Sequence, residues 1–210
     1  MFLLFKELVL PFILISSLSV SVIFTIHIDF LFNHHIGLEN YPLEGWLPFT
    51  ELLQQLLLLA SVSIFIWSSI KVEESRTFLI LVSGLFGCMF LRELDYYFDM
   101  IAHGFWFYPT ILLASSVIIY SMNHTTYLIS SARSFSQTNA YFNILVGLVI
   151  IMVFSRLFGS GTLWKDVMND DYHHLYKHVI QEGLESLGYI FLFIGSVHQF
   201  RSVKKNVITK

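Results

Sequence analysis

The sequence predicts an all-α integral membrane protein, a single polytopic domain over residues 1–210 built as a bundle of six transmembrane helices. The first observation is composition: the chain is 55% hydrophobic and 13% charged, with a mean hydropathy of +0.67. Soluble domains carry about 25% charged residues. The second is that six apolar segments approach the roughly 20 residues that one membrane crossing requires. The third is a strong asymmetry in where lysine and arginine fall.

Composition also argues against other classes of protein. The net charge of −3 and the lack of a basic stripe interleaved with aromatics give no signature of nucleic-acid binding. Cys88 is the only cysteine, so the chain has no disulfide framework and no site made of thiolate ligands.

The expected spans follow the apolar runs, and helix-terminal residues mark several of their ends. Pro48 and Pro109 suit a first helical turn, and Ser75 and Asn139 suit N-caps. The run after Lys6 exceeds the core of a cleavable signal and is expected to remain as the first span. The six spans are expected at about 8–28, 49–70, 77–98, 107–123, 140–158 and 177–200.

Lysine and arginine predict the orientation, because cytoplasmic connections are enriched in both. Eight of them fall at one end of the spans, whereas the connections 29–48 and 99–106 hold none. Both termini are therefore expected in the cytoplasm. The expected location is the plasma or inner membrane, which the chain crosses several times. The eight residues are Lys6, Lys71, Arg76, Arg133, Arg201, Lys204, Lys205 and Lys210.

Two polar stripes interrupt the apolar pattern, and charged groups inside a membrane are costly and usually functional. Their spacings of three and four place each stripe along one face of a helix. If the two helices run antiparallel, each residue of one stripe faces a residue of the other. The expected pairs are Arg92 with Glu185, Asp95 with Glu182, Asp99 with His178, and His103 with His174.

Helix rise places these stripes at matching depths. Arg92 and Glu185 each stand about 24 Å along the helix from the basic end, and Asp99 and His178 about 34 Å. Glu51 and Arg156 fall at similar levels on two other spans. The sequence thus predicts a polar pocket in the outer half of the bundle.

Carboxylates and imidazoles together suit Zn²⁺, Mn²⁺ or Fe²⁺, and helix bundles build such sites from inward-facing residues. The leading hypothesis is therefore an integral-membrane metal-binding protein with a divalent metal held by Asp99, His103, His178, Glu182 and Glu51. In its catalytic form, a metal-bound water attacks a lipid or amphiphilic substrate at the extracytoplasmic side. Glu185 and Asp95 then move the proton.

Two alternatives come from other classes. One is an ion- or proton-coupled transporter or channel component that uses the same polar residues as a relay. The other is a structural or accessory subunit, in which Arg92 and Arg156 neutralise the carboxylates in a buried ion-pair network. The lipid bilayer is the expected partner in all three.

Overall fold

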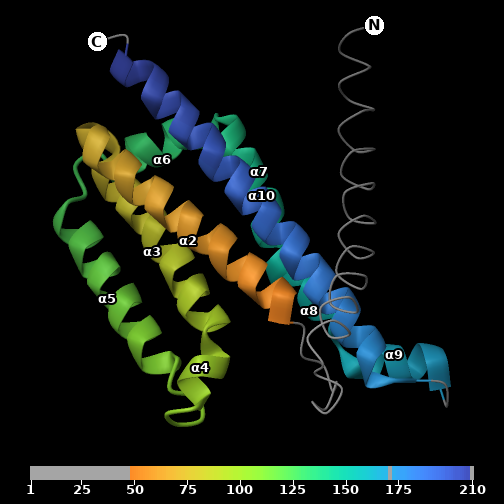
Figure 1. The fold of residues 1–210 in the computed structure, drawn as a ribbon. Helices are drawn as coiled ribbons and strands as arrows, with labels where there is room; N and C mark the ends of the chain where they lie inside the picture. The colour runs from red at the N-terminus through yellow and green to blue at the C-terminus, as the bar shows by residue number, and fades with distance from the viewer. Residues whose placement is uncertain (1–47, 170–171, 209–210) are drawn as a thin grey trace, which may run out of the picture. The chain divides into compact units, whose positions relative to one another are not determined.

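The computed structural model describes residues 48–169 and 172–208, and every element in those ranges is helical (Figure 1). The longer helices are α2 (Pro48–Lys71), α3 (Arg76–Glu93), α5 (Phe107–Asn123), α7 (Asn139–Val149) and α10 (His174–Ile208). The shorter elements are η1 (Glu73–Ser75), α4 (Asp95–Asp99), α6 (Leu128–Ser136), η2 (Ile150–Phe154), α8 (Ser155–Phe158) and α9 (Gly161–Met168).

Three helical stretches are long and apolar enough to cross a membrane: Thr50–Lys71, Glu73–Glu93 and Asn139–Phe158. Helix α5 is apolar but shorter, at 17 residues. These helices support the predicted membrane protein, while the count of six spans and their orientation stay predictions. The expected first span, 8–28, lies outside the described residues.

The chain divides into two compact units, whose boundaries cut through α2, α7 and α10. Unit 1 comprises Met1–Leu53 and Leu148–Gly188, and unit 2 comprises Gln54–Gly147 and Tyr189–Lys210. The single-domain organisation stays a prediction.

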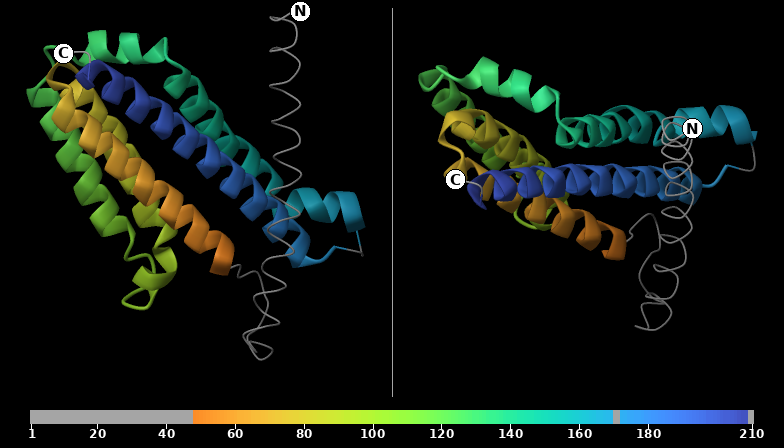
Figure 2. Two further views of the ribbon diagram at one scale, coloured as in Figure 1. Left: turned by 45° about the horizontal axis from the view of Figure 1, so that its top comes forward. Right: turned by 90° about the horizontal axis from the view of Figure 1, so that it is seen from above.

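Unit 2 is built around aromatic side chains that its helices bury. Phe65 on α2 meets Phe86 on α3 and Phe135 on α6 edge-on, with ring centroids 5.4 and 6.2 Å apart. Helices α3 and α5 pack along each other (Figure 2). This packing is close because Gly84 has no side chain: a Cβ there would lie 2.8 Å from Val117.

The end of α3 differs from the sequence prediction. The third span was expected to continue to residue 98, but the α-helix ends at Glu93, and Leu94 turns the chain before α4. The Asp95 carboxylate accepts the backbone N–H of Tyr96 at 2.6 Å, a local bond that competes with continued helix. The prediction that Arg92, Asp95, Asp99 and His103 share one helix face is therefore wrong.

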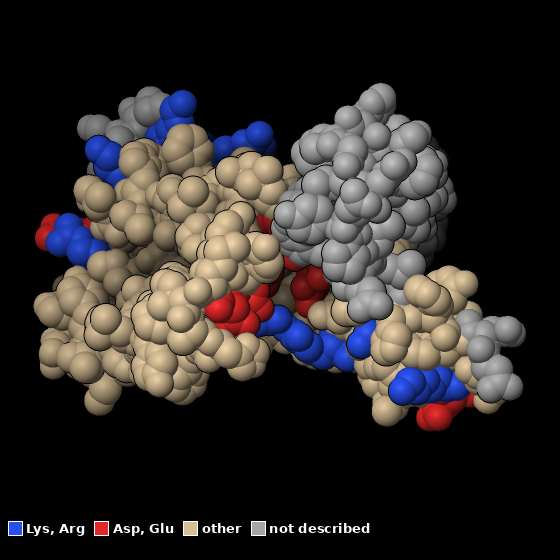
Figure 3. All heavy atoms as spheres, turned by 60° about the horizontal axis from the view of Figure 1, so that its bottom comes forward, with Lys and Arg blue, Asp and Glu red and all other residues tan. Residues whose placement is uncertain are grey.

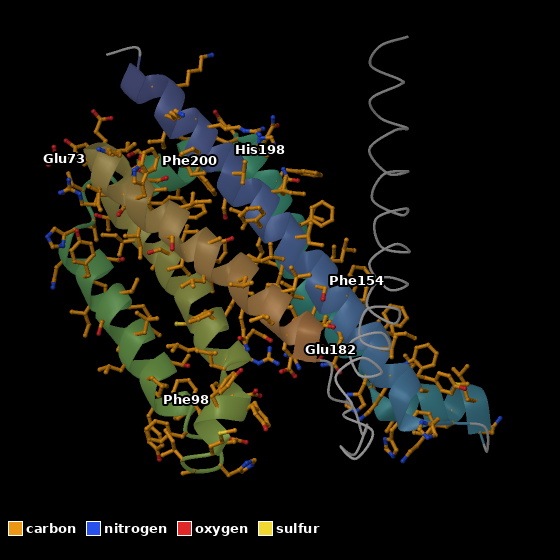
Figure 4. All side chains as sticks on the ribbon, in the orientation of Figure 1. Glu73, Phe98, Phe154, Glu182, His198 and Phe200 are labelled. Atoms are coloured by element: carbon orange, nitrogen blue, oxygen red, sulfur yellow. The ribbon has the colours of Figure 1, made fainter. Side chains whose placement is uncertain are left out.

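Unit 1 contains a departure from regular α-helix. Its segment η2 is a π-helix that joins α7 to α8. Such insertions are rare and occur frequently at functional sites. Phe154, the last residue of η2, and Glu182 of α10 are both labelled in Figure 4.

Candidate functional site: a buried carboxylate on the last helix

The most deeply buried acidic side chain among the described residues is Glu185, on α10 in unit 1. Only 4% of its side chain is exposed. Three groups meet one of its oxygens, Oε1: the Ser155 hydroxyl at 3.0 Å, the Gln181 amide nitrogen Nε2 at 3.2 Å and the Arg156 guanidinium at 3.9 Å. We call these four residues the Glu185 cluster.

The π-helical segment η2 precedes the residues that serve this carboxylate. Ser155 and Arg156 begin α8 immediately after η2. The Ser155 side chain is fully buried, and its oxygen also lies 2.7 Å from the carbonyl oxygen of Ile151. A hydroxyl carries one hydrogen, so Ser155 donates either to Glu185 or to this carbonyl.

Gln181 reaches the cluster from one turn before Glu185 on the same helix. A Cβ built at Gly159 would overlap the Gln181 side-chain amide, so a larger residue at 159 would force that amide to move. The backbone N–H of Gly159 donates to the Ser155 carbonyl at 2.7 Å and closes α8. The glycine thus ends one helix and leaves space for a donor from another.

Charge pairing explains how this carboxylate is tolerated inside the protein. A buried charge is normally paired and hydrogen-bonded, because the loss of hydration is otherwise uncompensated. Glu185 has two hydrogen-bond donors and one cation. The Arg156 side chain is 46% exposed, so its guanidinium contacts Glu185 and still reaches the surface of the described chain. The arrangement is suited to holding α10 against α8.

A second polar contact lies in unit 2. The Tyr189 hydroxyl, on the part of α10 that belongs to this unit, donates to Glu93 Oε1 at 2.7 Å. Gln55 Nε2 on α2 donates to the backbone carbonyl of Glu93 at 3.0 Å. Glu93, at the end of α3, therefore connects three helices of unit 2.

The predicted metal ligands fall into separate places. Asp99 and His103 are brought together, with Oδ2 and Nδ1 3.0 Å apart, in the turn after α4. The His103 side chain is 98% exposed. His178 and Glu182 lie one turn apart on α10, and Glu51 lies in the first turn of α2.

No three His, Cys, Asp or Glu side chains converge on a metal-sized site within the part of the chain that the structure describes. The predicted metal site and its divalent ion stay predictions. The facing of the two stripes also stays a prediction, because each expected pair joins residues of different units.

The two predicted proton-transfer residues have different surroundings. Asp95 starts α4 and is exposed, whereas Glu185 is buried in its cluster. The predicted ion-pairing residue Arg156 lies beside Glu185, and Arg92 lies half-buried in the last turn of α3.

Sequence reasoning did not find Ser155, Gln181 or Tyr189. Serine and glutamine in an apolar helix resemble neutral core residues, and a buried tyrosine resembles any aromatic side chain. The signal was their polarity in spans rich in Phe, Leu and Ile, since buried hydroxyls and amides require partners.

Comparisons with protein-family models, with curated proteins and with solved structures found no match to this chain.

Proposed function

We propose that this chain is a structural or accessory membrane protein whose Glu185 cluster fixes the position of α10. The observation that carries this proposal is the convergence of Ser155, Arg156 and Gln181 on a single oxygen of a buried carboxylate. A carboxylate oxygen engaged by three side chains of its own protein serves as a packing contact. We infer that this buried ionic contact fixes which helices meet, a role that such groups have in some proteins.

The proposed arrangement is a six-span bundle in the plasma or inner membrane, with both termini in the cytoplasm. Its support is the three described spans together with the lysine and arginine bias. Reporter fusions after Lys210 and within 161–172 test the orientation. An external signal from the C-terminal fusion would contradict it.

A matched pair of substitutions tests the structural role. Glu185→Ala and Asp99→Ala each remove one carboxylate, the first buried and the second 39% exposed. We expect a clear loss of thermal stability in detergent for the first and almost none for the second. Equal losses would show that burial of Glu185 carries no special stabilising role.

Metal binding is the second candidate, and the Asp99–His103 contact favours it because it brings two of the five predicted ligands together. A divalent ion there requires further ligands from His178, Glu182 or Glu51. The catalytic form of this candidate acts on a lipid or other amphiphile, with Glu185 and Asp95 moving protons.

Elemental analysis of the purified protein tests the metal candidate. Stoichiometric zinc, manganese or iron that falls on Asp99→Ala and on His178→Ala would favour a metalloprotein. Metal well below one equivalent per chain, unchanged by either substitution, would remove it.

A further inference from the structure

Helix α6 (Leu128–Ser136) in unit 2 presents three chemically different faces. One face is buried: Ser131 and Phe135, one turn apart, turn toward the rest of the unit. The Ser131 hydroxyl donates to the backbone carbonyl of Glu74 at 3.1 Å, and the Phe135 ring packs tilted against Phe78 at 5.2 Å. These contacts hold α6 against η1 and α3.

A second face is exposed and apolar. Ile129 is 83% exposed, and the neighbouring Tyr127, which precedes the helix, is also exposed. Arg133 follows Ile129 by one turn and is exposed on the same side.

The third face is polar and uncharged. Ser130 and Ser134 are exposed and one turn apart. Consecutive residues of an α-helix lie about 100° apart around its axis. Ser130 follows Ile129 and Ser134 follows Arg133, so the serine face is separate from the Ile129 face. The buried face thus packs on protein, the Ile129 face suits an apolar environment, and the serine face suits water.

The surrounding charge is predominantly positive. Among the described residues of unit 2, the ends of α2 and α10, the segment η1, the start of α3 and helix α6 together carry six basic residues and two acidic ones, Glu73 and Glu74 of η1. Glu73, His198 and Phe200 mark this end in Figure 4, and Phe98 marks the opposite end of the unit. The six basic residues are Lys71, Arg76, Arg133, Arg201, Lys204 and Lys205.

Much of the face of the molecule in Figure 3 is uncharged, with its Lys and Arg side chains confined to limited areas. The Arg76 guanidinium lies 3.7 Å from the Glu73 carboxylate, which is itself 87% exposed. An exposed pair of this kind is weak, so Glu73 offsets little of the positive charge of Arg76.

We propose that α6 is an interfacial helix that binds the surface of a membrane rich in anionic phospholipid. Ile129 enters the boundary between headgroups and acyl chains, as the apolar faces of such helices do. Arg133 reaches the phosphates along its own alkyl stem. Ser130 and Ser134 face water, and the Phe135 side keeps the helix attached to its unit.

Two fluorescent labels on α6 test this proposal. Cys88 is the only cysteine, so a Cys88→Ser background allows single labels at Ile129→Cys and at Ser134→Cys. The full chain is placed in nanodiscs of phosphatidylcholine, with and without phosphatidylglycerol. We expect nitroxide-bearing lipid to quench the label at 129, and aqueous iodide to quench the label at 134.

The charge requirement is tested by titrating brominated phosphatidylglycerol against the label at 129. One basic residue near an anionic surface contributes about 1 kcal/mol, so Arg133→Gln should weaken the apparent affinity about 5-fold. Ser130→Gln, on the serine face of the same helix, is the matched control and should leave the affinity unchanged.

Three results would overturn the proposal. Equal iodide quenching at 129 and 134 would place both faces in water. Shielding of 129 from both quenchers would indicate a protein contact there, such as a second copy of the chain. Lipid quenching at 129 that is identical without phosphatidylglycerol would show that anionic lipid is not required.

Discussion

The Glu185 cluster of unit 1 and the Asp99–His103 pair of unit 2 each bring an acidic side chain to a basic one, the first in a buried place and the second in an exposed one. Glu185 is almost completely enclosed, and its partners come from α8 and from its own helix. Asp99 contacts His103 at a similar distance, but both side chains are exposed at a turn. The comparison shows that a helical spacing of charges does not reveal whether they hold helices together or cap a loop.

The two carboxylates differ in how much of their hydration the protein replaces. Around Asp99, solvent remains, and the carboxylate also accepts the backbone N–H of Gly104 at 2.8 Å, which closes the turn. Around Glu185, side chains of the described part of the chain take the place of most of the water. Removing a partner should therefore cost far more at Glu185 than at Asp99.

The largest effect is expected for Arg156→Leu, which removes the cation beside the buried carboxylate. Loss of one partner of a fully buried pair costs about 3–5 kcal/mol, and the exposure of Arg156 reduces our expectation to about 2–3 kcal/mol. Thermal or denaturant unfolding in detergent measures this loss. Lys204→Leu, at an exposed position, is the control and should change the free energy of unfolding by less than about 0.5 kcal/mol.

A smaller loss is expected for Ser155→Ala. This change removes a buried hydroxyl that lies 3.0 Å from Glu185 Oε1, and a hydrogen bond to a charged group contributes about 1.5–3 kcal/mol. Because the hydroxyl is shared with the Ile151 carbonyl, we expect the lower part of that range. The exposed Ser116, which bonds only its own helix, supplies the control, and Ser116→Ala should leave stability nearly unchanged.

Tyr189→Phe removes one hydrogen bond to Glu93 and keeps the ring. Because Glu93 is only half-buried, water can replace part of the lost bond, and we expect a cost of about 1 kcal/mol. Unfolding of this variant can be compared with that of Tyr108→Phe, whose hydroxyl is on an exposed side chain. A similar small change in both variants would show that the Glu93 contact contributes nothing.

The smallest effect is expected at the turn. His103→Ala should lower the free energy of unfolding by less than about 0.5 kcal/mol, because exposed pairs contribute little and salt screens them. The measurement is repeated in low and high salt. A loss above about 2 kcal/mol that persists in high salt would show that this pair is buried in the membrane-embedded protein.

Hydropathy predicted the helical class and the approximate places of α2, α5 and the Asn139–Phe158 span. It missed the turn at Leu94 because the charged residues around it fit the spacing of a polar helix face, whereas the Asp95 carboxylate makes a local bond to the backbone there. The span expected at about 177–200 lies within a longer helix, since α10 runs from His174 to Ile208. Charged residues end an apolar run without ending a helix.

The site was predictable only in part. The carboxylates at positions 182 and 185 stand out in an apolar segment, so the sequence marks both as candidate site residues. Their partners could not, because helix depth does not identify neighbouring helices. The π-helical segment η2 has no sequence signature that we recognise.

A double-mutant cycle between Arg156 and Glu185 tests the central claim most directly. Glu185→Leu, Arg156→Leu and the double variant are compared with the natural chain by unfolding in detergent. We predict that Arg156→Leu costs more than Glu185→Leu, because the charge it leaves behind is the buried one. The double variant should recover about 1–2 kcal/mol relative to the sum of the single changes. Costs that add within about 0.5 kcal/mol would mean that the two residues do not interact, and would contradict a structural role for the Glu185 cluster.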